Sequence, residues 1–147
     1  MELDRERPFR NEEREQVRVL TPARLSVAIV AYRTEADTLH RSLTSLARSA
    51  QRAHDKGGLG AIELHLIDNG APEHSSIEPS VLDAWPARFG IPRVKSGHGN
   101  LGYGSANNLV LAELQSDYHL VMNPDVELEE GAIGAVDRKS TRLNSSH

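Results

Sequence analysis

An apolar segment that ends in a carboxylate is the first feature that could do chemistry. Residues 118–122 favour a β-strand, and Pro124 lacks the amide proton that a sheet requires, so we predict a strand that stops at Asn123. Asp125 then follows the strand's carboxyl end, the edge at which open α/β sheets bind ligands. A carboxylate beside phosphate groups is expected to hold a divalent cation, Mg²⁺ or Mn²⁺, that bridges it to a diphosphate. The alternative interpretation is a plain Asn-Pro-Asp turn.

The elements that must position this turn alternate between strand and helix. Apolar runs predict strands at residues 25–31, 61–67, 93–95 and 118–122. Apolar residues at helical spacing predict helices at 35–52, 105–114 and 127–136. Thr34 and Asp37 have the spacing of a capping box at the start of the first helix. This alternation predicts an α/β fold with a mostly parallel, Rossmann-like sheet that is flanked by helices.

Composition excludes several classes of protein. The 147 residues carry a net charge of −4 without a basic stretch that has interleaved aromatics, which argues against nucleic-acid binding. The chain has no cysteine, so disulfides and thiolate metal sites are excluded. No apolar run reaches the roughly 20 residues that span a bilayer, and the N-terminus is too charged for a secretory signal. We therefore expect a cytoplasmic protein without a membrane span in this chain, either free or peripheral at the inner face of the membrane.

The chain divides into three parts. Residues 1–22 mix acids with arginines and are expected to form a charged, flexible arm. Residues 23–136 carry the alternating pattern and are expected to form part of one domain. Residues 137–147 break that pattern abruptly and resemble a translated sequencing adapter, so we expect a non-native tail and a natural protein that continues further.

A glycine-rich segment allows two interpretations. Gly97, Gly99 and Gly102 match G-x-G-x-x-G between a predicted strand and a predicted helix, which is typical of an NAD-type dinucleotide site. Against it, the pattern lies in the third βα unit rather than the first, and only Asp117 and Asp125 offer the acid expected about 20 residues later. The competing interpretation takes residues 100–108 as the unit, because its glycines permit close backbone approach and its asparagines offer donors and acceptors.

Four motifs, taken in order, resemble the nucleotide-binding half of family 2 glycosyltransferases with the GT-A fold. The likeness is closest to rhamnosyltransferase-like members and covers about residues 26–136. The motifs are the strand ending at Tyr32, Ile67-Asp68-Asn69-Gly70, Asn100-Leu101-Gly102-Tyr103-Gly104-Ser105-Ala106-Asn107-Asn108 and Met122-Asn123-Pro124-Asp125-Val126. The resemblance implies transfer of a sugar from a UDP- or dTDP-sugar, with dTDP-rhamnose as one candidate, to a glycan or lipid-linked acceptor in cell-wall or polysaccharide biosynthesis.

The resemblance also implies roles for residues at the first two strand ends. Ala31 and Tyr32 match positions that line the nucleobase pocket, and Glu35 matches an acid beside it. Asp68 matches the carboxylate that accepts a hydrogen bond from the ring N–H of uracil or thymine.

The later motifs match positions nearer the sugar and the phosphates. Asn100, Gly102 and Asn107 match the loop that passes near the sugar and diphosphate. Asn123 and Asp125 stand where the family carries its D-x-D motif, which implies Asn123 near the ribose and Asp125 as the ligand of Mg²⁺ or Mn²⁺.

The chain departs from the family pattern at three positions. Arg33 stands where asparagine is common, Ala71 stands where serine is common, and Asn123 removes one carboxylate from the metal motif. Inverting members also need a carboxylate that deprotonates the acceptor, and that base belongs to the second half of the fold. The catalytic residue is therefore unknown, and we expect this chain to bind donor weakly at best and not to turn over. A non-catalytic nucleotide-binding fragment is the remaining alternative.

Overall fold

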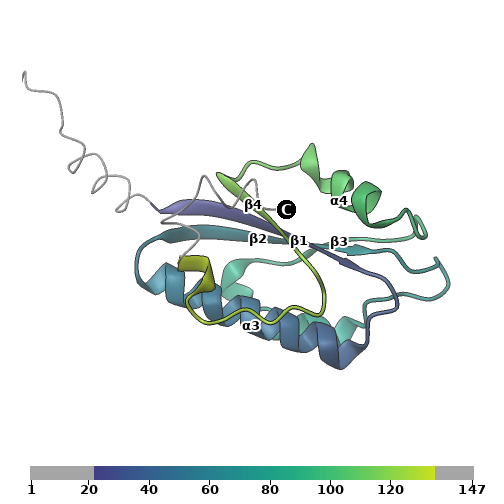
Figure 1. Ribbon diagram of the computed structural model, residues 1–147, viewed down its shortest axis with the longest axis horizontal. Helices are drawn as coiled ribbons and strands as arrows, with labels where there is room; N and C mark the ends of the chain where they lie inside the picture. Colours follow the sequence, from purple (N-terminus) through teal and green to yellow (C-terminus); the bar gives the residue numbers. More distant parts are fainter. Residues whose placement is uncertain (1–21, 135–147) are drawn as a thin grey trace, which may run out of the picture.

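Within residues 22–134, four parallel strands carry the fold and two α-helices cover opposite faces of the sheet (Figure 1). The computed structural model describes these residues, so the predicted tail at 137–147 and, apart from Pro22, the predicted arm at 1–22 lie outside the described residues. The strands are β1 (Ala23–Ala31), β2 (Leu59–Asp68), β3 (Arg93–Lys95) and β4 (Tyr118–Met122). The helices are α3 (Ala36–Asp55), α4 (Tyr103–Leu111) and the 3₁₀ helices η1 (Pro79–Ala84) and η2 (Ala87–Phe89). The predicted α/β fold with a parallel sheet is confirmed.

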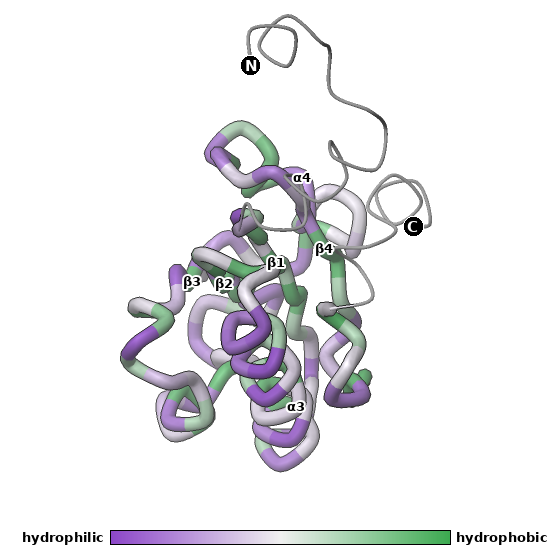
Figure 2. Tube along the Cα trace, turned by 90° about the vertical axis from the view of Figure 1, so that its left-hand side faces the viewer, coloured by the Kyte–Doolittle hydropathy of each residue, from purple (hydrophilic) through white to green (hydrophobic). Residues whose placement is uncertain are grey.

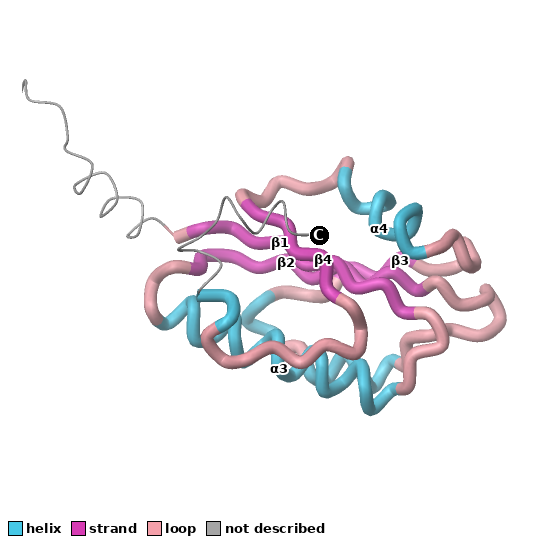
Figure 3. Tube along the Cα trace, in the orientation of Figure 1, coloured by secondary structure: helices cyan, strands magenta, loops and turns pink. Residues whose placement is uncertain are grey.

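The strand order β3-β2-β1-β4 places β1 in the middle of the sheet. Ala31 of β1 is opposite Asp68 of β2, and Ile29 is opposite Met122 of β4. The chain passes from β1 through α3 to β2, and it later returns through α4 to the other side of β1 (Figure 3). Because parallel connections are right-handed, this reversal puts α3 and α4 on opposite faces. The reversal beside β1 is a topological switch point, where α/β sheets bind ligands outside the carboxyl ends of their strands.

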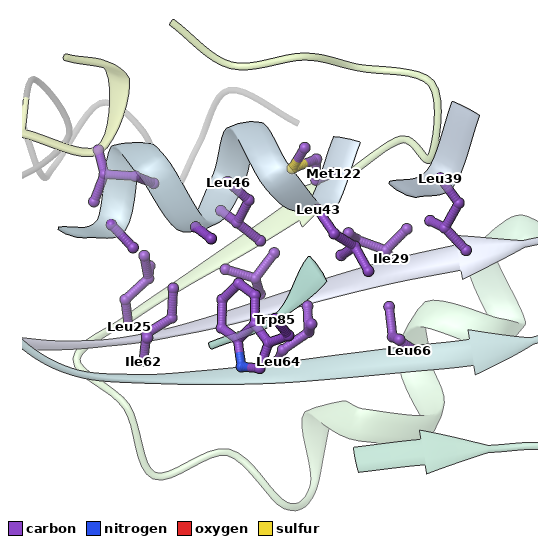
Figure 4. Packing of buried hydrophobic residues seen from close by; sticks show 14 of the residues in the cluster. Leu25, Ile29, Leu39, Leu43, Leu46, Ile62, Leu64, Leu66, Trp85 and Met122 are labelled. Atoms are coloured by element: carbon purple, nitrogen blue, oxygen red, sulfur yellow. The ribbon is translucent and has the colours of Figure 1, made fainter. Parts of the chain in front are cut away.

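The main core lies between the sheet and α3 (Figure 4). Leu39, Leu43 and Leu46 recur at the spacing of one helix face and are fully buried. They pack toward alternate residues of the strands, including Ile29 and Leu66, which are also fully buried. This packing holds the end of β1 and the start of α3 in place beside the switch point.

The face of the sheet beneath α4 has a smaller core and carries a buried histidine. Figure 2 shows green, hydrophobic stretches in the sheet between the two helices. The buried apolar residues on this face are Ala28, Val30, Ile67, Ala106 and Val110. His65, two residues before Ile67 on the same face of β2, is only 1% exposed, and both ring nitrogens lack a hydrogen-bond partner in the described part of the chain. Burial lowers the pKa of His65, because a buried cation loses its hydration.

The segment that follows β4 has turns but no regular secondary structure up to residue 131, so the predicted helix at 127–136 is wrong over residues 127–131. Buried serines of α3 hold this segment along the helix (Figure 3). The Ser42 hydroxyl donates to the Val126 carbonyl, and the hydroxyls of Ser45 and Ser49 accept from the amides of Leu128 and Ile133, both at 2.9 Å. A helical turn begins only at residue 132. These contacts satisfy backbone groups that a local helix would otherwise have paired.

The ends of the helices also differ from expectation. Glu35 is the residue before α3 and makes no capping bond with its side chain, so the predicted capping box of Thr34 and Asp37 is wrong. α4 runs from Tyr103 to Leu111 rather than over 105–114, because Gly102 provides the turn that starts it. None of the helices in residues 22–134 is long and apolar enough to cross a membrane.

Candidate functional site

The predicted site residues lie on segments that follow the carboxyl ends of the strands. Tyr32 follows β1, Asp68 ends β2, the glycine loop follows β3 and Asn123 follows β4. Glu35 immediately precedes α3 and is exposed. Because all four strands are parallel, their carboxyl ends meet at one edge of the sheet. The structure therefore brings the predicted segments to a single edge.

Asp68 closes the loop that follows β2. Its carboxylate accepts hydrogen bonds from the amides of Gly70 and Ser76, both at 2.9 Å, and from the Ser75 hydroxyl. The side chain is 3% exposed. Only glycine fits at position 70, since a Cβ there would lie 2.5 Å from the His74 carbonyl oxygen. The predicted acceptance of a base N–H by Asp68 stays a prediction, and it would use the second lone pair of Oδ2.

Asn69 is a site residue to which sequence patterns assigned no role. Its amide donates to the Ala31 carbonyl at 2.8 Å, and its side-chain Nδ2 donates to the Gly102 carbonyl at 3.2 Å and to Asn100 Oδ1 at 3.4 Å. Asn69 thus joins the ends of β1 and β2 to the glycine loop. Its Oδ1 is buried and has no partner within residues 22–134, so the described residues leave this acceptor unused. The one signal in the sequence was its position directly after Asp68.

The glycine loop turns sharply into α4. Asn100 Oδ1 accepts from the Gly102 amide at 2.9 Å, and Gly102 has φ 82°, a conformation that favours glycine. Asn107 lies one turn into the helix, where its Nδ2 donates to the Tyr103 carbonyl at 3.1 Å. Its Oδ1 is buried and lacks a partner in the described residues. Asn69, Asn100 and Gly102 are therefore in direct contact, and Asn107 follows them on α4.

The carboxyl end of β1 combines a buried residue, Ala31, with an exposed residue after the strand, Tyr32. Ala31 is fully buried in the core beneath α3, and its predicted contact with the base stays a prediction. Tyr32 is 42% exposed. The guanidinium carbon of Arg33 lies 5.1 Å from the centroid of the Tyr32 ring, and the Arg33 amide donates to the Ser76 hydroxyl at 3.0 Å. Tyr32 thus offers an aromatic surface at the switch point.

The end of β4 offers one carboxylate to a cation. Asn123 and Asp125 are exposed, and the Val126 amide donates to the Asn123 carbonyl at 3.2 Å, so the motif is also a turn. Residues 22–134 contain no group of three or more His, Cys, Asp or Glu side chains that could hold a metal ion. Mg²⁺ is commonly bound through one or two carboxylates together with substrate phosphates and water. The residues present therefore fit a cation that binds together with a diphosphate.

Comparison with known families decides the class of the protein. The family model for glycosyl transferase family 2 matches residues 26–138, which is more than half of the chain. The chain belongs to glycosyl transferase family 2. It is therefore a glycosyltransferase by family, and its parallel sheet with helices on both faces is consistent with the GT-A fold. No curated protein matches the chain.

Membership of family 2 bears on the alternative interpretation of the glycines. Gly97, Gly99 and Gly102 all have positive φ, as a tight phosphate-binding turn would require. They follow β3, however, which is three residues long and lies at the edge of the sheet. A dinucleotide fingerprint instead follows the first strand, beside the switch point. Both the topology and the family match favour the glycosyltransferase interpretation of this loop.

Proposed function

We propose that this family 2 domain binds a UDP- or dTDP-sugar at the carboxyl edge of its sheet and donates the sugar to a hydroxyl of a glycan or lipid-linked acceptor. The likeness to rhamnosyltransferase-like members makes dTDP-rhamnose the first donor to test. The observation that supports the proposal is that Tyr32, Asn69 and Asp125 follow three adjacent parallel strands, β1, β2 and β4, at one edge of the sheet. The cytoplasmic location and the role in polysaccharide biosynthesis stay predictions.

The nucleoside is assigned to the ends of β1 and β2. The exposed ring of Tyr32 can stack on a pyrimidine. The unpartnered Oδ1 of Asn69 and the free lone pair of Asp68 Oδ2 can accept from the ring N–H or from ribose hydroxyls. A buried acceptor without a partner costs free energy, and a ligand that donates to it would recover that cost.

The diphosphate is assigned to the turn after β4. A divalent cation bound there would neutralise charge on the departing diphosphate, a contribution of several kcal/mol. Asp125 is the residue that would hold the cation, since its side chain is exposed and has no ion pair or hydrogen bond within residues 22–134. Asn123 would lie near the ribose, and Asn100, Gly102 and Asn107 would face the sugar.

Two carboxylates that flank β4 and its turn are poor candidates for the base that deprotonates the acceptor. Asp117 precedes β4, so it lies at the opposite edge of the sheet, and it contacts Arg24. Glu127 follows the metal turn and forms an ion pair with Arg41 at 3.8 Å. The proposal therefore assigns the base to neither of these carboxylates.

Nucleotide binding tests the proposal directly. Titration calorimetry should show that UDP or dTDP binds in the presence of Mn²⁺, and that Asp125→Ala removes the part of the affinity that requires Mn²⁺. Asp83→Ala, which removes an exposed aspartate of η1, is the matched control and should bind as the wild type does. Binding of NAD(H) without metal, and its loss when Gly99 is enlarged, would instead support a dinucleotide enzyme. Failure of the wild-type chain to bind UDP or dTDP would contradict the proposal.

A further inference from the structure

Arg33 is held in a strained backbone conformation at the switch point. Its φ of 54° makes it the only residue other than glycine with positive φ in residues 22–134. Asparagine tolerates this region much better than arginine does, and asparagine is the residue common at this position in the family. Strained residues persist where the surrounding structure fixes them, and they concentrate at ligand sites. The bond from the Arg33 amide to the Ser76 hydroxyl, 3.0 Å long, contributes to fixing it here.

The charge of Arg33 is not neutralised by the protein. Arg24, Arg41, Arg52 and Arg93 each form an ion pair with a carboxylate. Arg33 is exposed and has no ion pair in the described part of the chain. The contact recorded for its guanidinium is with the ring of Tyr32, and an aromatic face attracts a cation without cancelling its charge.

The turn at residues 123–125 has one carboxylate fewer than the D-x-D motif of the family, so a diphosphate bound there depends more on positive charge from another residue. Asn123 is neutral, so Asp125 is the one carboxylate that the turn offers to a cation, and a site with fewer charged ligands binds a divalent ion more weakly. β1 lies directly beside β4, so Arg33 follows the strand adjacent to this turn. A guanidinium is also suited to phosphate, because its planar fork can donate two parallel hydrogen bonds.

We infer that Arg33 binds the diphosphate of the donor and supplies positive charge that does not depend on the metal. The inference rests on the proposed function, because it assigns a further residue to the same nucleotide site. It predicts that the wild-type protein keeps part of its affinity for a nucleoside diphosphate when divalent ions are removed. A role limited to supporting the Tyr32 ring predicts instead that Arg33 affects the nucleoside and the diphosphate equally.

The test compares UDP with uridine, or dTDP with thymidine, by titration calorimetry in excess EDTA. Arg33→Asn removes the charge and is compatible with positive φ, while Arg33→Lys keeps the charge and loses the fork. Arg33→Asn should lower the affinity for the diphosphate roughly tenfold and leave the affinity for the nucleoside unchanged. Arg33→Lys should lose less. The difference between wild type and Arg33→Asn should shrink as salt is added.

The Tyr32→Leu variant and the wild type distinguish the inference about Arg33 from the proposed function. Tyr32→Leu should weaken binding of the nucleoside, since it removes the stacking surface, whereas Arg33→Asn should not. Equal loss of both ligands in Arg33→Asn, or no loss of either, would overturn the inference while the proposed function stands. Absence of any nucleotide binding by the wild type, with and without Mn²⁺, would instead remove the proposed function itself.

Discussion

Asp68 ends β2 and Asp125 follows β4, the two neighbours of β1, yet the surroundings of the two carboxylates are opposite. Asp68 is 3% exposed and accepts from two amides and a hydroxyl of its own loop. Asp125 is exposed, and its side chain has no hydrogen bond or ion pair within residues 22–134. The fold thus uses one carboxylate to build the edge of the site and leaves the other available to a ligand. An aspartate at a strand end acquires its role from the donors that surround it.

Removal of the two carboxylates should separate stability from binding, and this is the largest effect that we expect. Asp68→Ala leaves the amides of Gly70 and Ser76 without their acceptor and should lower the free energy of unfolding by about 2–4 kcal/mol. Asp125→Ala should change it by less than about 0.5 kcal/mol, because the side chain is exposed. Urea denaturation measures both values. Similar losses in the two variants would show that the contrast between the carboxylates is wrong.

Substitution of two glycines compares the tight loop around Asp68 with an open position on α4, and we expect a smaller change in stability than for Asp68→Ala. Gly70→Ala places a Cβ 2.5 Å from the His74 carbonyl and should cost about 1–3 kcal/mol, because the loop held by Asp68 must shift. Gly104→Ala is the matched control, since no atom lies within 4 Å of its Cβ and the residue is helical. It should raise the stability by about 0.4–1 kcal/mol. Thermal unfolding of both variants tests the pair, and a stable Gly70→Ala protein would contradict the tight loop.

The face of the sheet beneath α4 carries the buried His65, and the face beneath α3 has no such histidine in the described residues. This third contrast makes the stability depend on pH. Burial keeps the pKa of His65 below its ordinary value, so the unfolded chain takes up a proton near pH 6.5 while the folded protein does not. Stability should therefore fall as the pH drops below about 6.5, until the folded state also binds the proton. One proton contributes a slope of at most about 1.4 kcal/mol per pH unit.

A variant isolates this histidine from the others. In His65→Leu, an apolar side chain of similar volume replaces the imidazole beneath α4. The stability of this variant should therefore depend less on pH between 6.5 and 5 than that of the wild type. The remaining histidines are present in both proteins, and the difference between the two curves belongs to His65. Parallel curves would show that His65 does not couple folding to pH.

Much of the fold could be read from local patterns. The apolar run of β1 and the leucine spacing of α3 predicted these elements because periodic burial is a property of neighbouring residues. Pro124 correctly predicted the end of β4, since proline cannot continue a ladder. The site segments were also predictable as strand exits, because parallel strands share one carboxyl edge. Their individual contacts with a donor stay predictions.

Other features depended on partners that are distant in the chain. The segment at 126–131 did not become a helix, because the hydroxyls of Ser42 and Ser45, about 84 residues earlier, bind its backbone, and Ser49 binds the amide of Ile133 just beyond it. Asn69 became a junction because the fold brought the glycine loop against the end of β2, 31 to 33 residues later in the chain. No local pattern contains such pairings.

The sequence by itself therefore determined the four strands, the helices α3 and α4, the residue types at the strand ends and the family of the protein. Only the tertiary structure decided which of those residues hold the site together and which remain available to a ligand. The physical reason is that periodicity and turn propensity act over a few residues, whereas the hydrogen-bond partners of a buried polar group are chosen by packing. Asp68 and Asp125 are the same residue type after similar strands, and the donors around them make the difference.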